Sequence, residues 1–246
     1  MSHPQVLTAL MTEHPTDSHT MERYTASGGY TQARRAMAMS RDEIVELVKS
    51  SGLLGRGGAA FSAGLKWSFL APARPSYLVV NGDESEPGTF KDRQLLERDP
   101  HQMIEGIIIT AVANEVHEAF IYIRGEYPKP SRRVQKAVDE AYAAGYLGKG
   151  IFGTDYDLDV TVHLGGGAYI CGEETALINS LEGRRGEPRI KQPFFPAAKG
   201  LYMMPTIVNN VETVSNLPHI LAMGADDYRA LGHADDCGTF LFSVSG

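Results

Sequence analysis

The chain has 246 residues, and its 23 Lys and Arg against 30 Asp and Glu give a formal net charge of −7 at pH 7. This acidic balance excludes an ordinary nucleic-acid-binding protein, because neutralising phosphates requires clustered Lys and Arg side chains. Glutamates interrupt the longest apolar stretch, residues 104–123, and residues 1–19 lack the basic start of a secretory signal, so we expect a cytoplasmic protein with no membrane insertion.

The first predicted elements follow a polar lead-in. Residues 1–20 are rich in His, Pro, Ser and Thr, and we expect them to be flexible. Residues 21–238 are expected to form one domain that begins with a short helical region. Apolar side chains at helical spacing predict a helix over 41–50, for which Ser40 is a suitable N-cap.

Short β-branched runs then alternate with helical patterns. The predicted strands are 77–81, 119–123, 159–164 and 206–209, and the predicted helices are 101–115, 131–144, 173–182 and 211–223. This alternation favours right-handed crossovers and an α/β fold with a mostly parallel sheet and helices on both faces. An apolar run at 240–244 predicts the first strand of a further domain, so residues 239–246 are expected to begin a domain that the chain lacks.

The first candidate site is the glycine-rich segment 55–67 (GRGGAAFSAGLKW). It fits a dinucleotide-binding fingerprint only loosely, because it follows a predicted helix and not a strand. Its small residues leave backbone amides open to a ligand, and Arg56 and Lys66 supply positive charge. A phosphate or pyrophosphate loop is therefore the favoured interpretation, and a structural turn is the alternative.

The second candidate, residues 81–93 (NGDESEPGTFKDR), follows the first predicted strand. Ligands of parallel α/β sheets bind outside the carboxyl ends of the strands. Asn81, Asp83, Glu84 and Glu86 are suited to the hydroxyls of a ribose or ribityl chain, or to a hard cation. A solvated acidic turn is the alternative.

The third candidate, residues 163–189, repeats the order of strand, glycine loop and helix. Glu173 and Glu174 fall in the first helical turn, and stabilisation of the helix N-terminus is enough to explain one of them. Cys171 is interpreted as a buried structural thiol, since no histidine is an evident base for it. Together with Cys237 it makes only two cysteines, too few for a four-thiolate cluster.

The fourth candidate is the segment 205–213 (PTIVNNVET), which places two carboxamides before a helix. Asn209 is the expected N-cap of that helix. The side chains of Asn210 and Thr213 would then be free to bind a ligand.

The four motifs, in this order, resemble the NADH-binding flavoprotein subunit of respiratory complex I. The resemblance runs from about Met21 to Gly246 and extends to the flavoprotein subunits of NAD-reducing hydrogenases and NAD-dependent formate dehydrogenases. It implies a Rossmann-like domain, preceded by a short helical region, that binds FMN and NAD(H). It also implies NADH:quinone oxidoreductase activity, in which hydride passes from NADH to FMN and electrons then enter an iron–sulfur chain.

The resemblance also implies the residues that bind the cofactors. The flavin and its phosphate are expected at Gly55, Gly57 and Lys66, with the ring and ribityl chain at Asn81, Asp83, Glu84, Tyr169, Gly172, Glu173 and Glu174. The other side of the flavin is expected at Val208, Asn209, Asn210 and Thr213. NADH is expected between Phe61, Phe69 and Phe194, with Glu86 and Glu174 on its polar groups.

Several positions depart from the family pattern. Ala60 and Ser62 replace a typical Gly and Pro, Leu54 replaces a common Arg, and Gly166 replaces a common Ala. One extra residue in QPFFPA (192–197) leaves open whether Phe194 or Phe195 stacks on the nucleotide. The family's later domains are missing, and with them the cysteines that hold its [4Fe–4S] cluster.

The implied partners are NADH and the peripheral-arm subunits of a complex I-like assembly, above all a small [2Fe–2S] subunit, on the inner face of the cell membrane. The KDR end of the second motif and the plain N-terminus favour complex I. Two alternatives remain: the flavoprotein subunit of a soluble hydrogenase or formate dehydrogenase, and a non-catalytic domain that binds FMN or a nucleotide.

Overall fold

The computed structural model describes residues 5–191, 195–233 and 235–246. Its centre is a sheet of four parallel strands in the order β3-β2-β1-β4. The strands are β1 (Tyr77–Gly82), β2 (Glu118–Ile123), β3 (Asp159–Leu164) and β4 (Thr206–Asn210). The predicted α/β class and all four predicted strands of the sheet are confirmed.

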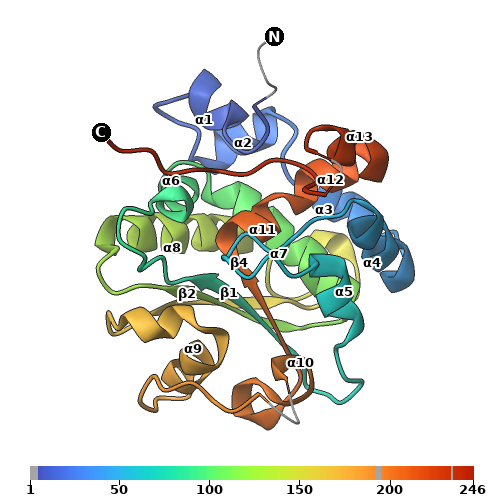
Figure 1. Cartoon of the computed structure of the whole chain (residues 1–246). Coiled ribbons are helices and arrows are strands. Elements are labelled where there is room, and N and C mark those ends of the chain that lie inside the picture. Colours follow the sequence, from blue (N-terminus) through green and yellow to red (C-terminus); the bar gives the residue numbers. More distant parts are fainter. Residues whose placement is uncertain (1–4, 192–194, 234) are drawn as a thin grey trace.

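Helices cover both faces of this sheet (Figure 1). One face carries α6 (Lys91–Arg98), α7 (Pro100–Asn114), α8 (Pro128–Ala143) and α11 (Val211–Ser215), and the other carries α9 (Glu174–Leu181) and α10 (Pro196–Lys199). The remaining helices are α1 (Ala9–Glu13), α2 (Met21–Ala26), α3 (Thr31–Ala36), α4 (Arg41–Ser50), α5 (Ala63–Ser68), α12 (Leu217–Met223) and α13 (Ala225–Ala230). Short 3₁₀ turns lie at Ile151–Gly153, Tyr169–Gly172 and Leu201–Met203.

Strand β1 shows why the sheet is covered on both faces. Its side chains alternate in direction, so Leu78 and Val80 join the large core under α7, whereas Tyr77 and Val79 join a smaller core under α9. All four are buried, which explains the continuous apolar run in the sequence.

Helix α7 is the central helix of the larger core. All of its residues except Val112 are buried, which is typical of a helix surrounded by protein. Gly106 on this helix faces α11 so closely that a Cβ atom there would lie 2.0 Å from the carbonyl oxygen of Val214. The absence of a side chain at Gly106 therefore sets the spacing of the two helices.

Residues 5–20 are packed against the domain, so the prediction of a flexible lead-in is wrong for them. Met11 on α1 and Leu7 in the turn before it are both buried in the large core. The Ser18 hydroxyl donates a 2.6 Å hydrogen bond to the carbonyl oxygen of Arg98. These two apolar residues outweigh the polar composition around them.

Two further expectations are corrected. The helix predicted over 211–223 is two helices that meet at Asn216, and Pro218 in the first turn of α12 prevents a continuous hydrogen-bond ladder. Residues 239–246 have no regular secondary structure, so the strand predicted at 240–244 is not formed. A strand needs a neighbouring strand to pair with, and this segment pairs with none in the described part of the chain.

Across the described ranges, no helix is long and apolar enough to cross a membrane.

Candidate functional site

The strand order creates a crevice at the carboxyl ends of β1 and β4. The chain continues from β1 to β2 on one side, whereas β4 is added on the other side, so the direction of winding reverses between β1 and β4. Such a reversal is the usual ligand site of an open parallel sheet. Asn81 and Asn210 are register partners at this edge, which brings the second and fourth motifs together.

The first motif forms a loop closed at its base. The amide of Gly55 donates a 2.8 Å hydrogen bond to the carbonyl oxygen of Phe61, and Leu54 and Ser62 form an isolated β-bridge. A Cβ atom on Gly57 would lie 3.2 Å from the Cβ of Asn210, so the loop backbone packs directly on the end of β4. Glycine permits this close approach.

The Arg56 side chain does not contribute its charge to the open face of this loop, so that expectation is corrected. The guanidinium is fully buried, donates a 2.8 Å hydrogen bond to the carbonyl oxygen of Cys237 and stacks on the ring of Phe240. The Arg56 amide donates to the Thr213 hydroxyl at 2.9 Å. Both contacts hold the loop on the side away from its open face.

Lys66 reaches into the crevice from α5. Its ammonium group donates 2.8 Å hydrogen bonds to the Glu174 carboxylate and to the carbonyl oxygen of Val208. The side chain stays one-quarter exposed. Of the two cations expected in the first motif, Lys66 is the one at the site.

Glu173 and Glu174 have separate roles. Glu173 is the N-cap of α9 and accepts hydrogen bonds from the amides of Thr175 and Ala176 at 2.8 and 2.9 Å. Glu174 faces Lys66 and Lys191. Burial opposes ionisation of Glu174, but the charges of these two lysines outweigh it and lower its pKa. Glu174 is therefore an ionised carboxylate in the crevice and is not needed as a helix cap.

Some polar groups of the second motif hold the fold together, and others remain available to a ligand. The Asn81 amide donates to the carbonyl oxygen of Gly172 at 2.8 Å, which joins the second and third motifs. Glu84 accepts hydrogen bonds at 2.9 and 3.0 Å from the amides of Asp92 and Arg93. Its carboxylate therefore caps the N-terminus of α6, and the expected contact of this side chain with a ligand is not supported by its geometry.

Asp83 carries an unused acceptor. One carboxylate oxygen accepts a 2.8 Å hydrogen bond from the Ser85 hydroxyl, and the other, Oδ2, is buried without a partner in the described structure. Burial raises the pKa of Asp83, although the Ser85 hydrogen bond opposes this effect. An unsatisfied buried acceptor costs about 1–3 kcal/mol. A hydroxyl or N–H group of a ligand would remove this cost.

The carboxamides of the fourth motif do not have their expected roles. Asn210 is the N-cap of α11, where it accepts a 3.0 Å hydrogen bond from the amide of Glu212. Asn209 is buried beside Trp67, whose indole N–H is 3.1 Å from the side-chain oxygen once the Asn209 amide is turned so that this oxygen accepts the hydrogen bond. The Thr213 hydroxyl is occupied by Arg56. The prediction that Asn209 is the cap and that Asn210 and Thr213 are free is therefore wrong.

A buried ion cluster beneath the crevice has no counterpart among the expectations from the sequence. The Lys91 ammonium lies 2.8 Å from Asp92, 2.9 Å from Glu212 and 3.3 Å from the Asn210 side-chain oxygen. Burial opposes its charge, but the two carboxylates outweigh burial and raise its pKa. The only sequence signal is the KDR end of the second motif.

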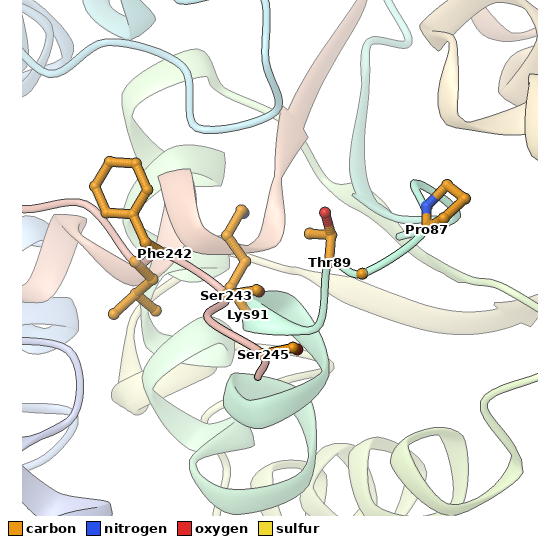
Figure 2. A pocket seen from close by; sticks show the side chains of 8 residues that line it. Pro87, Thr89, Lys91, Phe242, Ser243 and Ser245 are labelled. Atoms are coloured by element: carbon orange, nitrogen blue, oxygen red, sulfur yellow. The ribbon is translucent and has the colours of Figure 1, made fainter.

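A cavity of about 500 Å³ opens beside this ion cluster (Figure 2). Its lining includes Pro87, Thr89 and Lys91 from the second motif and Phe242, Ser243 and Ser245 from the C-terminal residues. Residues of the second motif and of the C-terminus thus line the same cavity. No sequence pattern indicates that these two segments are neighbours.

Exposed aromatic rings border the site. Phe61 and Phe69 are 48% and 56% exposed, and their ring centroids lie 6.3 Å apart. Tyr169 is also exposed and donates a hydrogen bond of 2.5 Å to Glu86. Phe194 lies outside the described residues, whereas Phe195 is described and is 58% exposed. Exposed rings of this size are suited to stacking on a planar ligand.

These features fit a flavin nucleotide. The loop backbone is open at Gly58, where a Cβ would meet nothing within 4 Å, and Lys66 supplies a cation nearby. The unpartnered oxygen of Asp83 is suited to a ribityl hydroxyl or a ring N–H. Among the described residues, no group of three or more His, Cys, Asp and Glu side chains is arranged to hold a metal ion, and the side chains of Cys171 and Cys237 are buried.

Fold and site together define a parallel α/β nucleotide-binding domain with its ligand crevice at the β1–β4 switch point. The family model of the Nuo51 FMN-binding domain matches residues 48–219. The chain therefore belongs to this family.

Relatives agree with the family match. The NADH-quinone oxidoreductase F subunit of Aquifex aeolicus (strain VF5) is 53% identical over 229 residues, which cover 93% of this chain and 54% of that protein. Its counterpart of the same name in Streptomyces coelicolor (strain ATCC BAA-471 / A3(2) / M145) is 53% identical over 232 residues, covering 94% and 51%. The chain thus spans about half the length of the curated relatives it matches.

Solved structures share the fold. A crystal structure of an NAD+-reducing [NiFe]-hydrogenase in the H2-reduced state superimposes with a TM-score of 0.83 at 36% identity, and the match covers 99% of this chain and 39% of that chain. A second structure of such a hydrogenase, in the air-oxidised state, gives a TM-score of 0.72 at 36% identity and covers 95% and 36%. The fold is therefore common to the two kinds of protein.

Proposed function

We propose that the chain is the flavoprotein module of an NADH:quinone oxidoreductase, in which NADH is oxidised at a bound FMN. The observation that carries this proposal is the convergence of four motifs on one crevice that offers a cation, an unsatisfied carboxylate oxygen and exposed aromatic rings. Membership of the Nuo51 FMN-binding domain family supports FMN as the flavin. The curated relatives, whose names describe NADH-quinone oxidoreductases, support NADH as the reductant.

FMN, when bound, supplies the hydride acceptor, so the protein needs no acid or base at that step. The residues of the chain instead bind and orient. The Gly57–Gly58 backbone and Lys66 would hold the phosphate, and Asp83 would accept a hydrogen bond from the ribityl chain or ring. Phe61 and Phe69 would stack on NADH and exclude water from the reacting atoms, with Glu174 on its ribose hydroxyls.

The proposed partners are the other subunits of a complex I-like assembly, especially a small [2Fe–2S] subunit, at the inner face of the cell membrane. Two alternatives have their own support. The superposition on NAD+-reducing hydrogenases is compatible with a soluble hydrogenase or formate dehydrogenase as the parent complex. The side chains of Glu84, Asn210 and Thr213 already have hydrogen-bond partners within the protein, which is compatible with a domain that binds a nucleotide without passing electrons on.

The flavin content of the purified chain tests the proposal. Heat-released flavin should co-elute with FMN on reversed-phase chromatography, because the crevice offers one compact phosphate loop. Anaerobic addition of NADH should bleach the flavin absorbance, and ferricyanide should restore it. A chain that takes up FMN but is not bleached by NADH would support the non-catalytic alternative, and a chain that takes up no FMN would refute the proposal.

A further inference from the structure

The C-terminal segment, residues 236–243, lies across the back of the candidate site without forming a helix or strand. It nevertheless contacts three of the elements that build the crevice. The Arg56 guanidinium in the first motif donates to the carbonyl oxygen of Cys237, the Glu212 carboxylate on α11 accepts from the amide of Leu241 at 3.0 Å, and the Ser243 hydroxyl accepts from the amide of Phe90 at 2.9 Å. The segment therefore bridges loops that are far apart in sequence.

Arg56 makes the shortest of these three hydrogen bonds, at 2.8 Å. Its guanidinium carbon lies 3.3 Å from the centroid of the Phe240 ring, and its side chain is completely shielded from solvent. The Oδ1 atom of Asp236 lies 3.6 Å from the Nη1 atom of Arg56. Desolvation of a cation on an aromatic face strengthens their attraction, because water no longer competes for the charge.

The same residue holds the glycine loop in place. The Arg56 amide donates to Thr213, so the backbone of the loop is fixed on one side to α11 and, through the guanidinium, on the other side to Phe240. Gly52, at the base of the loop, packs so tightly on Cys237 that a Cβ atom would lie 2.6 Å from its sulfur. The loop is thus clamped between α11 and the C-terminal segment.

We propose that Arg56 and Phe240 are positioning residues, which hold the glycine loop in the conformation that binds the flavin phosphate although neither side chain faces the ligand. This inference rests on the proposed function, since it assigns the loop to FMN. Binding to a loop that is already ordered costs less conformational entropy. Loosening the clamp should therefore weaken FMN binding without removing any group that contacts FMN.

Phe240 can be tested with matched variants. Phe240→Leu removes the aromatic face that Arg56 stacks on, whereas Phe240→Tyr keeps it and is the matched control. The dissociation constant of FMN, measured by quenching of its fluorescence well below each melting temperature, should rise about tenfold for Phe240→Leu. It should stay within about twofold of the original for Phe240→Tyr. Equal values for the two variants would overturn the proposal.

Hydrogen exchange separates the clamp from the flavin. In the flavin-free chain, the amides of Gly55 and Arg56 should exchange about tenfold faster in Phe240→Leu than in Phe240→Tyr, because they lie in the clamped loop. A lower melting temperature with unchanged exchange and unchanged FMN affinity would show that Phe240 only stabilises the fold, which would overturn the proposal. If the original chain binds no FMN, the proposed function fails, and the exchange result still decides whether the clamp exists.

Arg56→Lys supplies the second half of the test. Lysine keeps the charge but loses the planar stacking and the forked donor. If the two residues act together, the double variant Arg56→Lys with Phe240→Leu should bind FMN no more than about twofold more weakly than the more impaired single variant. Independent, multiplying effects would contradict a shared clamp.

Discussion

The ammonium group of Lys66 and the carboxylate of Glu174 form a 2.8 Å ion pair across the mouth of the crevice, between α5 and the first turn of α9. Lys191 binds the other oxygen of the same carboxylate at 3.0 Å. Since Glu173 caps α9, Glu174 is not needed as a helix cap, and its paired carboxylate stays at the mouth of the crevice. The position of a fixed negative charge here bears directly on which dinucleotide is accepted.

Glu174→Ala is expected to relax the preference for NADH over NADPH. Carboxylates in dinucleotide sites accept hydrogen bonds from ribose hydroxyls and repel a 2′-phosphate. Two like charges about 4 Å apart repel by roughly 4 kcal/mol at an effective dielectric near 20. The two lysines offset much of this, so we expect about 1 kcal/mol, or about a fivefold rise in the NADPH-to-NADH ratio of kcat/KM.

Glu173→Ala is the matched control for that measurement. It removes the helix cap, so the chain should lose about 1 kcal/mol of unfolding free energy while the NADPH-to-NADH ratio stays the same. If Glu174→Ala behaves in the same way as Glu173→Ala, then Glu174 contributes only to stability.

Ala60→Gly is expected to stabilise the chain by about 0.5–1 kcal/mol. Ala60 is exposed in the first motif and has φ 50°, in the left-handed region that disfavours residues with a Cβ atom. Ala59→Gly, at a position without a positive φ, should instead destabilise the chain. Urea denaturation of both variants measures this difference, and a change of the same sign in both would contradict the conformational explanation.

Stability is expected to fall between pH 7.5 and 5, partly because of His219. Burial lowers the pKa of His219 to about 4, and its ring contacts the side chain of Gln102. With an unfolded pKa near 6.5, the unfolded chain binds a proton in this range that the folded chain does not. Since the folded pKa lies below the unfolded pKa, stability is lost as the pH falls, by about 2 kcal/mol from this residue at about pH 5.

His219→Gln checks this assignment, because glutamine can also contact Gln102 but does not titrate. The unfolding free energy of the variant should fall by about 2 kcal/mol less between pH 7.5 and 5 than that of the original chain. An equal fall in both proteins would assign the acid sensitivity to other groups.

The sheet is well predicted because its strands carry their own signal. Buried parallel strands read as short apolar runs, and the residues 77–80 show this directly. The lead-in is misjudged, because two apolar residues, Leu7 and Met11, anchor a segment of otherwise polar composition. Composition averages over a segment, whereas docking depends on the few apolar residues that reach the core.

The segments that form the site are predicted more accurately than their contacts. All four motifs contribute to the crevice, yet the cap of α11 moves by one position because β4 continues through Asn210. The direction of Arg56 depends on Cys237 and Phe240, roughly 180 residues away, and no local pattern contains that information. Side-chain direction in a loop is set by tertiary packing, which spacing alone does not reveal.

The close approach of α7 and α11 at Gly106 links a position in the middle of the core to one wall of the crevice. Any side chain at this position must displace the backbone near Val214, and α11 begins just after Asn210, whose side chain caps it at the edge of the crevice. A side chain at Gly106 would therefore displace α11 and, with it, the Asn210 cap at the edge of the crevice. A substitution at Gly106 is therefore expected to weaken cofactor binding, although Gly106 lies on a helix away from the ligand crevice.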